Sequence, residues 1–269
     1  MNLGESLKKS IETGFIDKST SSDRKYRPKL LVNDKATNSK VLTTLLKELE
    51  QCDAFYFSVA FVTTGGIATL INTLIDLEEK QIKGKALVSQ YLNFTQPEAL
   101  KKLNRFSNIE LRIATEGDFH SKAYLFKNDS LYNLIVGSSN LTQTALCSNN
   151  ELNLRISATI NSELVNLAIA NFQTNFEAGK FVDEDFIASY SKIYQSQFEQ
   201  SSISKTVADS QGKSITPNKM QADALLSIAS LRAEGKDKAL LVSATGTGKT
   251  YLSAFDVQRF NPKKFLFIV

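Results

Sequence analysis

The sequence predicts an α/β fold in which a mixed or parallel sheet is flanked by helices, and three observations support this. Short apolar segments rich in aromatic and β-branched residues alternate with amphipathic helical segments between residues 31 and 176. A glycine-rich segment, residues 244–250, follows a further apolar run. The chain has 269 residues, 42% hydrophobic and 22% charged, which allows one full core and a second, smaller unit.

The elements of the main unit follow from this periodicity. Residues 1–30 are polar and rich in Ser, Lys and Asp, and predict an N-terminal arm or a loosely docked helix. Helices are predicted over residues 39–49, 65–81, 96–106 and 161–176, with helical character continuing over 181–198. Strands are predicted over residues 54–62, 85–88, 109–114, 122–126, 132–136 and 152–157. The βαβα alternation indicates a layered sheet with helices packed on it.

A change of composition divides the chain. Residues 197–214 are dominated by Ser, Gln and Lys, so we expect a domain over 31–190, a linker over 191–214 and a second unit over 215–269. In the second unit we expect helices over 217–231 and 249–260 and strands over 238–242 and 265–269.

Net charge, cysteine content and the lack of long apolar runs indicate the cellular setting of the protein. The net charge of +4 permits a nucleic-acid partner without requiring one. Cys52 and Cys147 lack metal-site spacing and indicate reduced thiols. No secretory signal and no apolar run near the roughly 18 residues of a membrane span is present, so we expect a cytoplasmic protein with no membrane partner.

The only histidine, His120, lies in a chemically informative setting. Lys122 is two residues further along a predicted strand, where the i and i+2 side chains share a face. About one strand later, Gly137 precedes Ser138 and Asn140, which again share a face, and the glycine allows close backbone approach. These groups supply a nucleophile or proton carrier, a cation and two neutral hydrogen-bonding side chains. Phosphodiester chemistry requires that set.

Three separated motifs in order resemble the phospholipase D superfamily: His120-x-Lys122, Gly137-Ser-Ser-Asn140 and the segment 149–153, Asn-Asn-Glu-Leu-Asn. The resemblance spans about residues 31–176 and implies that His120 forms a covalent phosphohistidine. It also implies that Lys122, Ser138 and Asn140 bind the phosphate and that Glu151 orients the imidazole. Such chemistry needs no metal, and the sequence has no carboxylate cluster typical of a metal site.

The chain departs from the family signature at one position. Lys127 stands where many members have Asp, and Asp129 is nearby but out of phase. Some nuclease members lack this Asp, so we read the loss as tolerable, and it gives more weight to Glu151. The alternative is a family fold that has lost its activity.

The histidine count has a consequence for assembly. The family mechanism uses two histidines, one to attack phosphorus and one to protonate the leaving group, and this chain has one. The resemblance therefore implies a homodimer in which two copies share one active site.

The glycine-rich segment 244–250, Ala-Thr-Gly-Thr-Gly-Lys-Thr, is similar to motif I of superfamily 2 helicases, of the DEAD/DEAH type. The generic phosphate loop has Gly where this chain has Ser243. Backbone N–H groups around Gly246 and Gly248 would wrap phosphate, Lys249 would contact the outer phosphates, and Thr250 would hold Mg²⁺. The candidate nucleotide-binding residues are Thr245, Gly246, Thr247, Gly248, Lys249 and Thr250.

Upstream, Gln221 resembles the adenine-reading glutamine of these helicases, although an exposed helix position explains it equally well. The acidic motif and the arginine-bearing second lobe of such an ATPase are not in the sequence. We therefore expect an incomplete RecA-like lobe that cannot hydrolyse ATP as given, with ATP and Mg²⁺ as cofactors only if the lobe is completed.

A phospholipase D-like domain joined to a helicase resembles restriction and defence nucleases. The resemblance implies a metal-independent DNA endonuclease that acts through a phosphohistidine. Two alternatives remain: a non-catalytic DNA-binding and dimerisation module of a helicase, and a lipid phosphodiesterase. The sequence leaves open DNA or RNA, strandedness and the recognition sequence.

Overall fold

The computed structural model describes residues 2–89, 94–115, 119–206, 217–241, 248–260, 262 and 264. It divides into two compact units, Met1–Gln200 and Ser201–Val269, each of which is described by itself.

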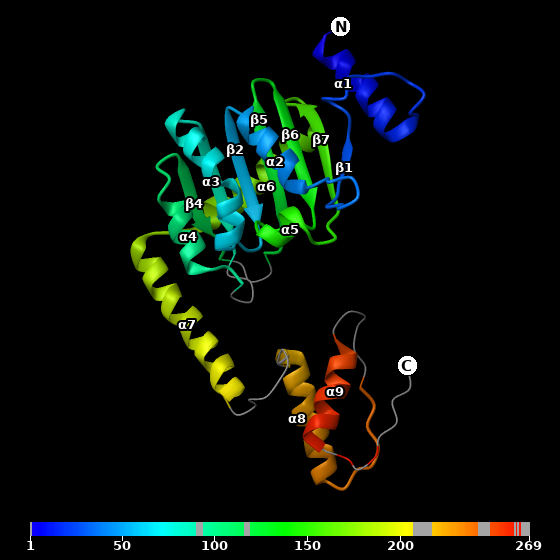
Figure 1. The fold of residues 1–269 in the computed structure, drawn as a ribbon, viewed down its shortest axis with the longest axis vertical. Helices are drawn as coiled ribbons and strands as arrows, with labels where there is room; N and C mark the ends of the chain where they lie inside the picture. The colour runs from blue at the N-terminus through cyan, green and yellow to red at the C-terminus, as the bar shows by residue number, and fades with distance from the viewer. Residues whose placement is uncertain are drawn as a thin grey trace. The chain divides into compact units, whose positions relative to one another are not determined.

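The first unit is built on a mixed sheet, which confirms the predicted fold class (Figure 1). Among the described residues its eight strands have the order β1-β7-β6-β5-β2-β3-β4-β8. Strands β2, β3 and β4 run parallel and the remaining pairs are antiparallel. The strands are β1 Lys29–Leu31, β2 Ala54–Val59, β3 Lys83–Val88, β4 Ile109–Ile113, β5 Lys122–Asn128, β6 Leu131–Gly137, β7 Asn153–Thr159 and β8 Lys180–Phe181.

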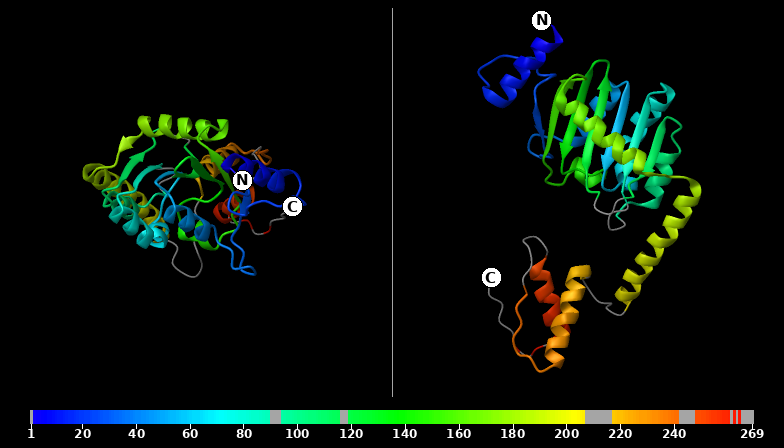
Figure 2. Two further views of the ribbon diagram at one scale, coloured as in Figure 1. Left: turned by 90° about the horizontal axis from the view of Figure 1, so that it is seen from above. Right: turned by 180° about the vertical axis from the view of Figure 1, so that it is seen from behind.

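Helices cover both faces of this sheet, as Figure 2 shows from two directions. Helices α2, α3 and α4 pack on one face, and α6 crosses the other. The bounds are α1 Leu3–Ile11, α2 Val41–Glu50, α3 Thr64–Glu79, α4 Pro97–Asn104, α5 Gln143–Cys147, α6 Glu163–Ala178 and α7 Glu184–Thr206, with a π-helical turn at Glu12–Ile16. None of the described helices is long and apolar enough to cross a bilayer.

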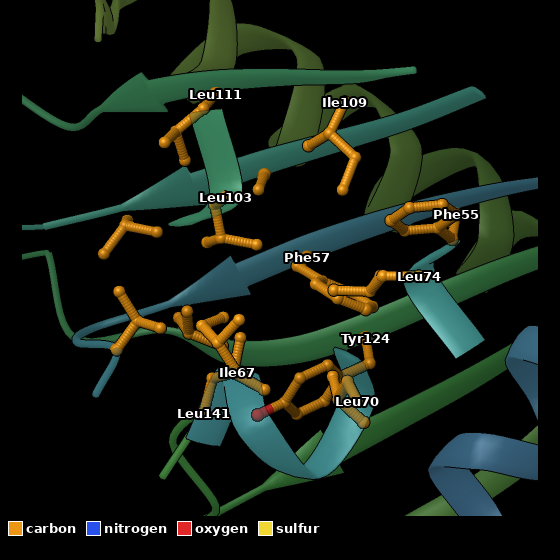
Figure 3. Packing of buried hydrophobic residues seen from close by; sticks show 14 of the residues in the cluster. Phe55, Phe57, Ile67, Leu70, Leu74, Leu103, Ile109, Leu111, Tyr124 and Leu141 are labelled. Atoms are coloured by element: carbon orange, nitrogen blue, oxygen red, sulfur yellow. The ribbon is translucent and has the colours of Figure 1, made fainter. Parts of the chain in front are cut away.

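The core follows from the alternation of side chains along the strands. Phe55 and Phe57 of β2 point to the α3 side, where Phe57 meets Tyr124 of β5 with ring centroids 5.3 Å apart (Figure 3). Leu70 and Leu74 of α3 pack on the same cluster and are fully buried. Burial on this scale, at about 1.5–3 kcal/mol for each large side chain, fixes the register of β2 against β5.

One buried network is polar. Arg155 of β7 forms an ion pair with Glu48 of α2 at 2.9 Å, and Asn133 donates to the other Glu48 oxygen at 2.7 Å. Ser157 completes the network by donating to Asn133, and Arg155 also donates to the Lys25 carbonyl oxygen at 2.7 Å. The network therefore ties α2, the middle strands and the N-terminal arm together.

Part of the predicted linker is helical, and its assignment as a linker stays a prediction. Residues 197–206 continue α7 as a helix, because Ser, Gln and Lys without Gly or Pro do not interrupt a helix. Residues 207–214 of the predicted linker lie outside the described residues.

In the second unit, the predicted helices are present as α8 Lys219–Ala233 and α9 Lys249–Phe260. Arg232 and Asp256 join them through two hydrogen bonds of 2.6 and 2.7 Å. The strand predicted over 238–242 is wrong for residues 238–241, where no strand forms and Leu240 is 90% exposed. A strand needs a paired neighbour, and the described part of this unit offers none. Residue 242 and the strand predicted over 265–269 lie outside the described residues.

Candidate active site

The predicted catalytic residues meet at one edge of the sheet. In register, Val59 of β2 lies beside Lys122 of β5, Ala123 beside Val136 of β6, and Gly137 beside Asn153 of β7. Lys122 opens β5, and the other candidate residues lie one to three residues beyond these strand ends. The structure thus brings together His120, Lys122, Ser138, Asn140 and Glu151.

His120 and Lys122 are in direct contact. The Lys122 Nζ atom lies 2.9 Å from His120 Nδ1 and 3.2 Å from Nε2, and it donates to the His120 carbonyl oxygen at 2.9 Å. Partial burial lowers the pKa of Lys122, and the negative charge of Glu151 opposes that shift. A cation therefore lies within hydrogen-bond distance of the imidazole, in an environment that also contains a carboxylate.

Ser138 and Glu151 form the second contact. The Ser138 hydroxyl donates a short hydrogen bond to Glu151 Oε2 and accepts one from the Leu152 backbone N–H at 3.0 Å. Gly137 makes this approach possible, since a Cβ there would overlap the Leu152 carbonyl group. The sequence-based expectation of close backbone approach at this glycine is confirmed.

Asn140, which follows β6, is held by the segment that follows β2. Its side-chain oxygen accepts a hydrogen bond from the Phe61 backbone N–H at 3.2 Å, and the residue is 6% exposed. The two uncharged side chains among the three predicted phosphate-binding residues thus differ, with Ser138 exposed and Asn140 buried.

A supporting layer lies beneath these residues, and the sequence analysis assigned it no role. The Tyr124 hydroxyl donates to the Ser139 carbonyl oxygen at 3.0 Å, and Asn153 exchanges hydrogen bonds of 2.9 and 3.2 Å with Ser139. All three residues are buried, and burial raises the pKa of Tyr124. Fixed partners of this kind hold the turn that presents Ser138 and Asn140.

Ser89 has a similar role beside His120. It follows β3, and its hydroxyl lies within hydrogen-bond distance of the Ala60 and Phe119 carbonyl oxygens, at 2.8 and 3.2 Å. The second of these contacts fixes the backbone just before His120. A serine that ends a buried strand was the available sequence signal, although serines are too common there to predict a role.

The position at which the chain departs from the family signature lies away from this edge. Lys127 pairs with Ala54, at the opposite end of β5 from Lys122. Asp129 is further still, in the turn after β5, where its backbone N–H bonds to Asp53. At about 3.3 Å per strand residue, Lys127 is roughly 17 Å from the site edge.

An open groove of about 430 Å³ adjoins the site. Ser138, Asn140 and Glu151 line it together with Phe61, Gln96 and residues around the amino-terminal ends of α3 and α5. A substrate phosphate at Ser138 would therefore have room beside it for a neighbouring chemical group.

In the second unit, Gln221 is 5% exposed, so the alternative of an exposed helix position is wrong. Its side chain forms a capping box with Asn218 and donates to the Gly248 carbonyl oxygen at 3.0 Å. Gly248 has a φ of +81°, which glycine adopts without strain, and Lys249 and Thr250 open α9. Thr245, Gly246 and Thr247 lie outside the described residues.

The described part of the chain contains no group of three or more His, Cys, Asp or Glu side chains arranged to hold a metal ion.

Two family models match the chain. Residues 45–177 match the model described as cardiolipin synthase, PLD-like domain, and residues 214–269 match that of the type III restriction enzyme, res subunit. No curated protein sequence matches.

Several solved structures resemble the first unit. NucT from Helicobacter pylori is 17% identical, with a TM-score of 0.46, covering 58% of this chain and 99% of its own. Nuc from Salmonella typhimurium, a phospholipase D family member, is 18% identical, with a TM-score of 0.46 and coverage of 59% and 100%. Phosphatidylserine synthase from Haemophilus influenzae is 15% identical, with a TM-score of 0.47 and coverage of 67% and 47%.

Proposed function

We propose that this protein is a metal-independent DNA endonuclease. The chain carries a phospholipase D-like domain over residues 45–177, followed by part of a restriction-type helicase region over 214–269. It cleaves phosphodiester bonds through a phosphohistidine intermediate and belongs to a restriction or helicase-type system. The observation that supports this best is the contact of Lys122 with His120 at the sheet edge that also presents the Ser138–Glu151 pair.

The reaction has two steps. A neutral His120 ring nitrogen attacks phosphorus, the P–O bond to the leaving strand breaks, and a second histidine gives its proton to the leaving oxygen. Water then attacks the phosphohistidine, the P–N bond breaks, and the second histidine takes a proton from that water. Atoms and charges balance without an additional reactant.

Lys122, Ser138 and Asn140 stabilise the negative charge that develops on the phosphoryl oxygens. The Lys122 ammonium group contacts the imidazole nitrogens of His120, and a phosphodiester oxygen is a stronger, charge-assisted acceptor. Substrate would therefore draw Lys122 from His120 toward the phosphate, where its charge is needed. Donors of this kind are each worth about 10²–10³ in rate, and Ser138 and Asn140 would supply the others.

The second histidine must come from another chain, because this sequence has one. An apolar patch beside the site suits a second copy. Val136 is 42% exposed, Leu152 is 58% exposed and Leu30 is 67% exposed, and these three residues define the patch. Val136 and Leu30 both lie opposite Leu154 of β7, on neighbouring strands. A homodimer that covers this patch would bring two copies of His120 toward one shared site.

DNA is the favoured substrate because of the associated region. The chain joins the phosphodiesterase fold to a segment that matches a type III restriction enzyme subunit, rather than to a lipid-synthesis domain. We propose that DNA is the partner of the whole protein.

The experiment is cleavage of plasmid and single-stranded DNA by the purified chain in excess EDTA. We expect cutting by the wild type and none by His120→Ala or Lys122→Met. Lys127→Met is the matched control, since it removes a lysine from the opposite end of the same strand and leaves the site intact. Trapping of ³²P on the wild type, and not on His120→Ala, would identify the intermediate.

Two outcomes would contradict the proposal. Cutting that EDTA abolishes would mean that a metal ion performs the chemistry. A folded wild type that binds DNA with no cutting would favour the alternative of a non-catalytic binding and dimerisation module.

A further inference from the structure

Two phenylalanine rings form an exposed aromatic ledge beside the site. Phe61 follows β2 and Phe94 precedes α4, and their ring centroids are 5.4 Å apart with the planes tilted by 44°. Phe94 is 53% exposed, whereas Phe61 is half-buried and lines the groove next to Ser138. An aromatic ring left in water at a site edge is costly for folding and favourable for binding a planar ligand.

The ledge is joined rigidly to the candidate phosphate-binding residues. The Phe61 backbone N–H is the donor that holds the Asn140 side chain. Next to Phe94, the Thr95 hydroxyl donates to the Ser89 carbonyl oxygen at 2.6 Å, and the Thr95 carbonyl accepts from Tyr190 at 2.7 Å. Thr95 is fully buried, so the backbone that carries Phe94 is fixed.

The groove beside the ledge has the wrong chemistry for a second phosphate. Glu151 is the one charged residue among those that line it, and a groove that follows a nucleic-acid backbone is positively charged. Its other lining side chains are mostly amides and hydroxyls, among them Thr64, Gln96 and Gln143. Such groups recognise the neutral edges of a base or sugar.

One of these amides is already oriented. The Gln96 side-chain oxygen accepts from the Thr64 backbone N–H at 2.7 Å and from its hydroxyl at 2.9 Å. Its NH₂ group is left as a donor for a ligand in the groove. The volume of about 430 Å³ is in the usual range for small-molecule sites and suits a nucleoside.

We propose that Phe61, Phe94 and this groove form a nucleobase subsite, which stacks one unpaired base beside the scissile phosphate and makes single-stranded DNA the preferred substrate. The inference rests on the proposed nuclease function and specifies its substrate. A base stacked on the ledge has left its helical stack, so a duplex must first unpair there, and a single strand need not.

The test compares three substrates of one sequence in EDTA: a single-stranded oligonucleotide, the same strand in a duplex, and a strand in which a central tract is abasic. We expect the wild type to cut the base-containing single strand fastest. Phe94→Ala should lower kcat/KM on that strand by roughly 5- to 150-fold, the usual loss for one stacked base, and leave the abasic rate unchanged. Phe94→Trp should restore the preference, because it restores a stacking surface.

Phe15→Ala is the matched control, since Phe15 is 59% exposed in the N-terminal arm and its loss should change no rate. Equal cutting of base-containing and abasic strands by the wild type would overturn the proposal, as would an equal loss on both in Phe94→Ala. If no strand is cut, the nucleobase subsite is tested instead by the binding of fluorescently labelled versions of these strands, measured by anisotropy. A Phe94-dependent preference for the strand with bases then supports the subsite although the nuclease proposal has failed, and its absence rejects the subsite.

Discussion

Ser138, Lys122 and Asn140, which are expected to bind phosphate, each contact another group of the protein in the structure. Ser138 bonds to Glu151, and Lys122 lies against His120, so two of the residues expected to bind phosphate are each paired with another candidate catalytic residue before substrate arrives. Such contacts satisfy the polar side chains in the absence of substrate, and each is weak enough to exchange, since a typical hydrogen bond contributes a net stabilisation of about 0.5–1.5 kcal/mol. A phosphodiester, which accepts charge-assisted bonds, can replace them.

The pKa of Lys122 leads to a prediction for pH dependence. Burial lowers this pKa below the ordinary lysine value of 10.5, and the Glu151 carboxylate raises it again. If charged Lys122 holds the phosphate, kcat/KM is retained below its pKa and lost as the pH rises through it. In Glu151→Gln, the remaining activity should fall at a lower pH than in the wild type, because the carboxylate that raises the pKa of Lys122 has gone. Profiles of kcat/KM from neutral to strongly alkaline pH measure this, with exposed Glu163→Gln as control. An unmoved limb in Glu151→Gln would show that Lys122 does not set it.

At the scale of elements, the periodicity of apolar residues predicted most helices and strands of the main unit. It did not predict very short strands or contacts between residues far apart in sequence. Strands β2 to β7 and helices α2, α3, α4 and α6 were predicted to within a few residues, since each buries a regular apolar face. Strands β1 and β8, of three and two residues, are too short to show a period. Spacing in sequence put the candidate catalytic residues on successive strands. It gave no sign that Tyr124 and Ser89 support them, because those contacts depend on which strands become neighbours.

The buried pair that joins α2 to β7 gives a prediction at this scale. Arg155→Met leaves the Glu48 carboxylate buried without its cation, and we expect the free energy of unfolding to fall by about 3–5 kcal/mol. The double variant Glu48→Met with Arg155→Met removes both charges and should recover most of this loss. Urea unfolding followed by circular dichroism measures both. A double variant as unstable as the sum of the single variants would mean that the pair is not coupled.

For the whole molecule, the proposed shared active site would make activity depend on association of two copies. Val136 lies in the apolar patch beside the site, so Val136→Glu should both convert the proposed homodimer to a monomer and abolish cleavage. Leu167→Glu is the matched control, since it introduces the same charge at a leucine of α6 that is 63% exposed and not one of the three patch residues. Light scattering and the cleavage assay measure the two properties on the same samples.

Mixing tests the same point without altering the patch. After subunit exchange with an equal amount of His120→Ala, activity per wild-type chain should fall to about half, because only dimers with two wild-type copies keep both histidines. Full retention of activity, or an active species with the mass of one chain, would mean that each copy works alone.

The arrangement of the sheet edge also affects how activity is lost on unfolding. Five separate stretches meet there, around residues 60, 89, 120, 138 and 151, and strands from both the parallel and the antiparallel part of the sheet hold them. These are long-range pairings, which form together when a domain folds. A partly unfolded first unit would therefore have no cleavage centre at all. Enzyme activity should then report the fraction of fully folded chains and fall in step with the loss of the sheet during denaturation.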